Sequence, residues 1–295
     1  MSQTTTSSHL DPLPPIDLES KTSFRGSFST GMDILVALLT ILATVPLFSL
    51  LYMVIYKGLS RFRFDMLWEL PPGAGMEGGG FGNAIVGTLA LVAIAAAVSV
   101  PLGILTAVFL TEYARGSKIA QGIRFASKIL SGLPSILAGV FIYAVVVLAL
   151  GSFSVLAGGL ALAVLMLPII VLSAEEALLR VPRTLRDAST GLGATTSQTV
   201  LRVTLPACAP SLITGVMLAV ARAAGETAPV MFTALFSDYW ISSLFEQTAS
   251  LSMIIYNFAG MPFENMLDIA WSASLVLILL VLATNIVSHL IAARK

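Results

Sequence analysis

The hydrophobic positions of this chain fall into long runs that shorter polar segments separate. An α-helix needs about 20 apolar residues to cross the hydrocarbon layer of a bilayer. Stretches close to or beyond this length predict six transmembrane helices, at residues 34–56, 81–111, 133–150, 153–173, 207–236 and 267–292. The predicted fold is therefore all-α, that of a polytopic membrane protein with six transmembrane helices.

The segments between these runs differ in character. Residues 1–30 are rich in Ser, Thr and Pro and lack apolar periodicity, which predicts a disordered cytoplasmic N-terminal tail ahead of a transmembrane domain at 31–295. Only Gly151 and Ser152 separate the third and fourth runs, so these two helices are expected to form a tight hairpin. Pro101 lies inside the second run, where we expect a tilt, a kink or an interfacial end.

Basic residues predict the orientation, because cytoplasmic loops carry an excess of Lys and Arg. With both termini in the cytoplasm, twelve of the 16 basic residues lie in inner segments. Three of the others, Lys57, Arg61 and Arg63, lie in the first outer loop, and Arg222 lies within a run. We therefore expect both termini in the cytoplasm and Glu175 and Glu176 as solvated charges at the inner end of the fourth helix.

Composition excludes several other classes of protein. Hydrophobic residues make up 57% of the 295 positions and charged residues 11%, against about 25% charged in soluble domains. The formal net charge of zero gives no electrostatic reason to expect a nucleic-acid partner. A single cysteine and two distant histidines predict neither an internal disulfide nor a metal site. No phosphate-cradling Gly-x4-Gly-Lys-Ser/Thr or hydrolase motif occurs, so we expect no catalytic residues and no enzymatic activity in this chain.

The inner segment at 174–206 is long and internally organised. Apolar residues recur at spacings of three and four, which places them on one apolar stripe of a helix. Pro182 suits the first turn of a new helix, the glycines 191 and 193 end it, and a second short helix is expected near 197–205. The apolar positions are Leu178, Val181, Leu185, Ala188 and Leu192. Such a stripe packs against the chain's own helices, the lipid interface or a partner protein, and its periodicity leaves these alternatives open.

This segment resembles the EAA loop of ABC importer permeases, and we call it the EAA-like loop. The spacing fits without a gap, although Asp187, Ser189 and Val203 stand where the family has Glu, Ala and Ile. The resemblance implies that the loop docks into a cleft on a cytoplasmic ATPase and transmits the ATPase's closure to the membrane helices. The residues that match the motif are Asp187, Ala188, Ser189, Gly193, Val203, Leu205 and Pro206.

A second segment narrows the resemblance. Residues 225–229 read Gly-Glu-Thr-Ala-Pro, which is similar to the signature of PstA-type permeases in phosphate-specific importers. The resemblance extends from about Gly82 to Asn285 and implies the type I ABC importer permease fold. It also implies a bacterial inner-membrane subunit that carries inorganic phosphate inward. The implied partners are a PstC-type second permease, two copies of a PstB-type ATPase that uses ATP and Mg, and an external PstS-type phosphate-binding protein. The chain itself is expected to need no cofactor.

Two charges lie within the fifth apolar run, Arg222 and Glu226. A charge near the bilayer centre costs about 2.5–3.5 kcal/mol on insertion scales, whereas an i,i+4 pair returns only about 0.2–0.5 kcal/mol. We therefore expect the pair to face a bundle interior or a water-filled cavity. Gly225 and Pro229 are expected to let the helix loosen there. The predicted substrate pathway comprises Arg222, Gly225, Glu226 and Thr227.

The chemistry of these residues fits an oxyanion. The planar guanidinium of Arg222 can donate to two phosphate oxygens at once and stays charged at any relevant pH. Glu226 would either hold Arg222 at rest or accept a proton or hydrogen bond from protonated phosphate. One alternative is a buried ion pair that fixes helix packing. Others are a permease for sulfate or molybdate, or an ion-coupled carrier that works without an ATPase.

Overall fold

A computed structural model describes residues 24–293, with side chains for 28–287 and Leu290. The predicted N-terminal tail lies outside the described residues as far as position 23, and residues 24–30 form the first turns of helix α1 (Phe24–Arg61). The chain divides into two units, Met1–Tyr52 and Met53–Lys295, which are described separately. The first unit contains most of α1, an apolar helix that continues through Pro46.

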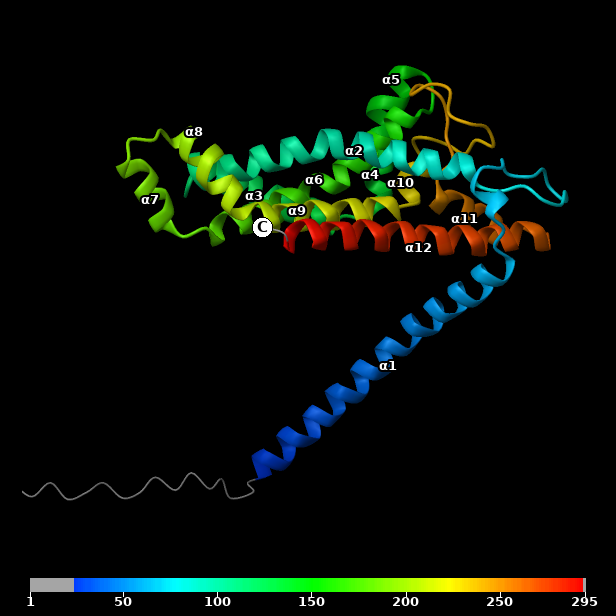
Figure 1. The fold of residues 1–295 in the computed structure, drawn as a ribbon, viewed down its shortest axis with the longest axis horizontal. Coiled ribbons are helices and arrows are strands. Elements are labelled where there is room, and N and C mark those ends of the chain that lie inside the picture. The colour runs from blue at the N-terminus through cyan, green and yellow to red at the C-terminus, as the bar shows by residue number, and fades with distance from the viewer. Residues whose placement is uncertain (1–23, 294–295) are drawn as a thin grey trace, which may run out of the picture. The chain divides into compact units, whose positions relative to one another are not determined.

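Four long helices form the centre of the second unit, and Figure 1 shows them running alongside one another. Helix α2 packs along α6, α9 packs against both, and α12 packs against α9. The bounds of these helices are α2 (Gly82–Val108), α6 (Val155–Arg180), α9 (Leu205–Ala224) and α12 (Glu264–Ala293). All four include most of a predicted apolar run. Their apolar surfaces are stable only against lipid or another helix, which favours this side-by-side packing.

Small residues allow the central helices to approach closely. A Cβ atom on Gly159 would lie 2.6 Å from Ile94, and one on Gly103 would lie 2.6 Å from Ile170. Both contacts join α2 to α6, and such small residues are typical of helix interfaces in membranes. The core around them combines alanines with buried aliphatic side chains such as Leu91, Leu162 and Met166.

The third predicted helix is the second arm of a bent pair. Helix α3 (Lys118–Gly132), which the apolar pattern did not predict, meets the second arm at an angle of 106°. That arm comprises α4 (Ser135–Ile142), the π-helical turn η3 (Tyr143–Val147) and α5 (Leu148–Leu150). The bend lies at Leu133-Pro134, where proline disfavours helical backbone in the residue before it. Gly151, with φ of 69°, ends α5 and begins the predicted tight hairpin into α6.

The EAA-like loop lies at one end of the four-helix group, as Figure 1 shows for α7 and α8. It contains α7 (Arg183–Gly191), α8 (Thr196–Thr199) and the π-helical turn η4 (Val200–Thr204), which continues directly into α9. The apolar stripe from Leu178 to Leu192 is divided between two helices, because α6 ends at Arg180 and Val181-Pro182 separates it from α7, close to where a new helix was expected to begin at Pro182. Proline disfavours helix in the residue before it and lacks the N–H that would continue the ladder.

The fifth predicted helix also differs in the structure. Helix α9 ends at Ala224, and after the break comes only α10 (Ala228–Met231) before an irregular segment. The prediction of one helix over 207–236 is therefore wrong, although the loosening expected near Gly225 is present. Helix α11 (Leu251–Ala259), which was not predicted, packs against α12 at the end of the group opposite α7, and η1 (Phe64–Leu67) contacts α2.

The apolar helices agree with a multi-pass membrane protein. Within residues 24–293, five helices are long and apolar enough to cross a membrane, and a sixth span results if the bent pair counts as one. The same residues contain no β-strand, so the predicted all-α class is confirmed.

Candidate functional site

Arg222 lies in the last turn of α9, and Glu226 lies in the break that follows. Nε of Arg222 is 3.5 Å from Oε1 of Glu226, and the two side chains are 55% and 18% exposed. The Gly225 and Glu226 N–H groups donate to the carbonyls of Arg222 and Ala223, at 3.1 and 3.2 Å, which tightens the helix end. The two charges therefore flank a helix terminus, where the helix dipole favours the cation, and do not lie within a continuous helix as predicted.

The segment that follows the end of α9 is held in place by α11, by α4 and by a contact of its own. Oγ of Ser252, on α11, donates to the Glu226 carbonyl at 3.0 Å, and Oγ1 of Thr233 donates to the Pro229 carbonyl at 2.7 Å. On the α4 side, a Cβ atom on Gly139 would lie 2.7 Å from the Pro229 Cα, so the two backbones are in close contact. Backbone groups that the helix break frees are thus satisfied by hydroxyl side chains, as irregular backbone in a membrane requires.

Arg222 belongs to the face of α9 that this chain leaves open. Exposed residues recur along α9 at spacings of three and four, whereas the opposite face packs into the core. The exposed positions are Ala207, Ser211, Thr214, Leu218 and Arg222, and the buried ones are Cys208, Leu212, Gly215, Ala219 and Ala223. Arg222 is therefore not packed inside the core of this chain, and Thr227 beside it is half-buried.

The open face of α9 continues into a polar hollow beside α6. A pocket of about 250 Å³ lies there, nearer to the EAA-like loop than Arg222 is along α9. Its lining includes the hydroxyl residues Ser173, Ser211 and Thr214, together with the Glu176–Arg180 ion pair of α6. Polar side chains thus follow Arg222 along one face of otherwise apolar helices.

The EAA-like residues occupy two neighbouring pieces of structure. On α7, Asp187 and Ala188 are exposed, while Ser189 is half-buried and its Oγ lies 2.9 Å from Oγ1 of Thr199. This contact joins α7 to α8, and Gly193 turns the chain between them with φ of 85°. The remaining predicted residues follow α8, with Val203 and Leu205 half-buried and Pro206 exposed. The structure therefore brings Asp187, Ala188 and Ser189 together on one helix, places Gly193 between α7 and α8, and places the other three at the start of α9 or just before it.

Two apolar residues of the loop are exposed. Leu185 is 45% exposed, and Leu192 is 91% exposed. Both belong to the stripe expected from the sequence, whereas Leu178 and Val181 of that stripe are buried against the chain's own helices. The stripe therefore packs internally at its α6 end and is open to a partner at its α7 end.

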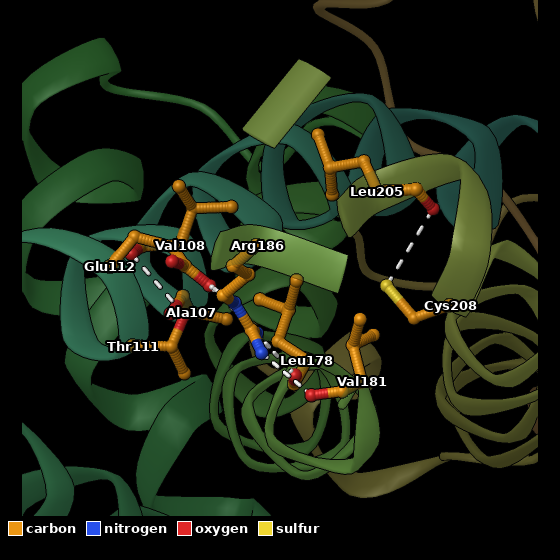
Figure 2. Close-up of polar contacts among 9 residues, drawn as sticks. All are labelled: Ala107, Val108, Thr111, Glu112, Leu178, Val181, Arg186, Leu205 and Cys208. Atoms are coloured by element: carbon orange, nitrogen blue, oxygen red, sulfur yellow. Dashed lines mark hydrogen bonds and ion pairs between the residues drawn. The ribbon is translucent and has the colours of Figure 1, made fainter. Parts of the chain in front are cut away.

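The sequence interpretation missed a buried arginine next to Asp187. Arg186 is the buried residue of α7, and Figure 2 shows its guanidinium between Glu112 and two backbone carbonyls. Its Nε and Nη2 donate to Oε1 of Glu112 at 3.1 and 2.9 Å, and Nη1 and Nη2 donate to the carbonyls of Val181 and Leu178 at 2.6 and 2.8 Å. The only sequence signal was an acidic residue on the expected inner side, 74 positions away.

The expectation for Glu175 is wrong. Glu175 is 7% exposed, and its Oε1 accepts from Nε of Arg124 at 2.6 Å, whereas Glu176 is exposed and pairs with Arg180 on its own helix. The reason is tertiary, because α3 packs against α6 and covers the side where Glu175 lies. Among the described residues there is no group of three or more His, Cys, Asp or Glu side chains that could hold a metal ion.

Long apolar helices, one of which carries polar side chains along its open face and ends at a charged break, together with an organised loop at one end, are typical of a membrane component of a transport system. The chain belongs to the family of binding-protein-dependent transport system inner membrane components, whose model matches residues 99–295. Within that family, it is 38% identical over 246 residues to the phosphate transport system permease protein PstA of Yersinia pestis, and the match covers 83% of each chain.

A less similar relative and two solved structures point to the same kind of permease. The chain is 33% identical over 251 residues to the probable phosphate transport system permease protein PstA of Methanocaldococcus jannaschii, with 84% of this chain and 88% of that one covered. A structure of a bacterial alginate ABC transporter matches with a TM-score of 0.65 and 14% identity, covering 93% of this chain and 98% of that one. The MetNI methionine ABC transporter matches with a TM-score of 0.59 and 21% identity, covering 79% and 99%. These likenesses confirm the predicted ABC importer permease fold.

Proposed function

We propose that the chain is the permease subunit of an ATP-driven ABC importer that carries inorganic phosphate into the cytoplasm. One observation carries the proposal: Arg222 stands at the helix break of the Gly-Glu-Thr-Ala-Pro segment, on a face of α9 that its own chain leaves open. The relatives named as phosphate transport permeases support the choice of substrate.

The position of Arg222 suits a passing anion. A guanidinium in contact with lipid is unfavourable, so an exposed arginine in a membrane helix requires water, a counter-charge or another protein beside it. Glu226 lies 3.5 Å away and is mostly buried, so it neutralises part of the charge and leaves donors of Arg222 free on the open side. A phosphate can accept two hydrogen bonds from that planar group at once. The hydroxyl residues farther along the same face would then solvate the ion on its way.

The open surfaces also support the partners. The uncovered face of α9 fits a second, PstC-type permease, so that the pathway lies between the two subunits. The exposed Asp187, Ala188, Leu185 and Leu192 fit a cleft on one of two PstB-type ATPase subunits, which would bind ATP and Mg. In this proposal the α7–α8 end and both termini face the cytoplasm, and the α11 end faces the side where a PstS-type protein delivers phosphate. The chain acts as a transport subunit, and hydrolysis belongs to the ATPase.

Reconstitution tests the proposal. The chain is co-expressed with its own second permease and ATPase, the complex is placed in vesicles with the external binding protein, and uptake of radiolabelled phosphate is followed. We expect uptake that requires ATP, is blocked by vanadate, and is not reduced by about a hundredfold excess of sulfate or molybdate, which is well below the roughly 10⁴–10⁵-fold discrimination that a hydrogen-bonding site can give. Uptake that sulfate abolishes would reassign the substrate. Uptake that continues without ATP in energised vesicles would instead indicate an ion-coupled carrier.

A further inference from the structure

The end of α2 contacts two helices of the EAA-like loop at once. Its last turn is the π-helical turn η2 (Phe109–Tyr113), whose width is shown by the Ala114 N–H donating to the Phe109 carbonyl at 2.8 Å. Within η2, Glu112 pairs with Arg186 of α7, and the hydroxyl of Tyr113 lies 3.1 Å from Oγ of Ser197 in α8. Consecutive side chains of one turn therefore contact both helices of the loop.

The geometry of the turn explains how this is possible. A π-helical turn is rare, and such turns are frequent at functional sites. Thr111 is buried and its Oγ1 donates to the Ala107 carbonyl at 2.9 Å, so the turn is fixed to α2 on its inner side. The extra residue then leaves Glu112 and Tyr113 on the side of the loop. The turn thus serves as the attachment of α2 to α7 and α8.

Of the two contacts, the ion pair between Arg186 and Glu112 is stronger than the hydroxyl contact between Tyr113 and Ser197. The side chains of Arg186 and Glu112 are only 10% and 8% exposed, so their charges are largely removed from water. The same guanidinium donates to the carbonyls of Leu178, in the last turn of α6, and of Val181, the residue that follows it, where helical carbonyls lack the usual i+4 partners. Losing either charge of a buried pair leaves the other uncompensated. One side chain of α7 therefore joins the ends of α2 and α6.

Without this contact, α7 would have little connection to α2, and the chain at Val181-Pro182 would be its main link to α6. The backbone of α7 packs mainly against α8 and η4, which continue into α9. Val181-Pro182 on one side of α7, and the turn at Gly193 on the other, are its only covalent connections. A displacement of α7 would reach α9 through η4 and α6 through Val181-Pro182, whereas Arg186 carries it to the end of α2 and also ties it to the end of α6.

We propose that Glu112 and Arg186 are positioning residues that make η2 and the EAA-like loop move as one body, so that a displacement of α7 is carried into α2 and α6 as well as α9. This inference rests on the proposed function. It assigns to the pair a role in transmission and none in binding the ATPase, because both side chains are buried beneath the surface that would contact it.

The first test measures transmission. ATP hydrolysis and phosphate uptake are recorded in the same vesicles for Glu112→Gln, with ATPase co-purification as the measure of assembly. We expect uptake per ATP to fall about fivefold or more, the lower range for coupled sites, while the ATPase still co-purifies. Arg186→Lys should give an intermediate ratio, because a single ammonium cannot donate to Glu112 and both carbonyls together. Arg183→Gln, an exposed arginine on the same helix, is the matched control and should keep the wild-type ratio.

An unchanged ratio in Glu112→Gln would overturn the inference, and so would an equal loss in Arg183→Gln. If Glu112→Gln fails to assemble with the ATPase, the inference is tested by a second measurement on a protein that keeps both Glu112 and Arg186. Spin labels are placed on Arg115→Cys and Arg183→Cys, two exposed positions beside the pair, in a Cys208→Ala background. The distance between the labels should be the same without nucleotide and in the vanadate-trapped state, and a change in that distance would refute movement as one body. Failure of the proposed function would show separately, as absent ATP-driven uptake in the unmodified complex.

Discussion

Nε of Arg124 lies 2.6 Å from Oε1 of Glu175, and this ion pair joins α3 to α6 across 51 positions of sequence. Nη2 of the same arginine also donates to the Leu110 carbonyl at 3.2 Å, so α3 is attached to the end of α2 as well. Together with the break at Leu133-Pro134, these contacts hold α3 across the bundle at 106° to the second arm of the pair.

Glu175 and its neighbour Glu176 should therefore respond differently to the same change. Glu175→Ala leaves Arg124 partly buried without a counter-charge, which costs on the order of 3 kcal/mol. Glu176→Ala removes only an exposed i,i+4 pair with Arg180, and such pairs contribute about 0–1 kcal/mol. Thermal unfolding in detergent, followed by circular dichroism, should show a clear loss for the first variant and almost none for the second. Equal midpoints would contradict the structural role of the buried pair.

Arg222 should be needed for uptake and not for assembly. Arg222→Gln removes the charge from a half-exposed side chain at a helix end, so the fold should persist while ATP-dependent phosphate uptake is lost. Arg222→Lys should restore little, because lysine lacks the planar pair of donors. The measurement is radiolabelled uptake in vesicles, with co-purification of the ATPase as the measure of assembly.

Leu218→Gln is the matched control for Arg222, since Leu218 lies on the same exposed face one turn away. It introduces the same amide without removing a charge, and it should leave most of the uptake. Wild-type uptake in Arg222→Gln would remove this residue from the pathway. Equal loss in both variants would point to a general sensitivity of that face to substitution.

The apolar runs predicted where long helices lie better than where they end. Hydropathy continues to Phe236, yet α9 stops at Ala224, because Gly225 and Pro229 act on backbone geometry and not on hydrophobicity. The same reasoning applies at Val181-Pro182, where the apolar spacing continues and the helix does not. Pro182 was expected to begin a new helix and Gly225 and Pro229 to loosen the fifth one, but the complete end of α9 at Ala224 was not predicted.

The residues of the candidate site also differ in how far the sequence predicted them. Arg222 and Glu226 were predicted because a charge inside an apolar run is costly and four residues is a local spacing. Arg186 and Glu175 were not, because their partners lie 74 and 51 positions away and only tertiary packing brings them together. A charge inside an apolar run can therefore be singled out from the sequence, whereas the burial of Arg186 and Glu175 depends on tertiary partners that the sequence does not show.

Gly87 illustrates a close approach that a methyl group should disrupt. A Cβ atom there would lie 1.9 Å from the Ala249 carbonyl oxygen and 2.5 Å from Oγ1 of Thr248, both just ahead of α11. Gly87→Ala should therefore destabilise the protein by about 1–3 kcal/mol, the usual cost of overpacking. Gly122→Ala is the matched control, because no atom lies within 4 Å of that position in α3, and it should stabilise by up to about 1 kcal/mol. Unfolding midpoints of the two variants should move in opposite directions, and a shared direction would contradict the packing described.

Gly193 and Gly191 provide a comparison within the EAA-like loop. Gly193 has φ of 85°, and its N–H donates to the Thr190 carbonyl at 2.9 Å, so it turns the chain out of α7. Gly193→Ala forces a side chain into the left-handed region at a cost of roughly 1–2 kcal/mol, although nothing within 4 Å would clash. The loop should relieve that strain by changing the angle between α7 and α8, which moves Asp187 and weakens ATPase association in a pull-down.

Gly191 is also free of neighbours within 4 Å but ends α7 without a positive φ. Gly191→Ala should therefore leave ATPase association unchanged and slightly strengthen the helix. Gly193→Asn should lie between the two alanine variants, because asparagine tolerates the left-handed region better than alanine does. If Gly193→Ala and Gly191→Ala retain the same amount of ATPase, the backbone turn at Gly193 is not what orients the loop, and the side chains on α7 alone would have to account for docking.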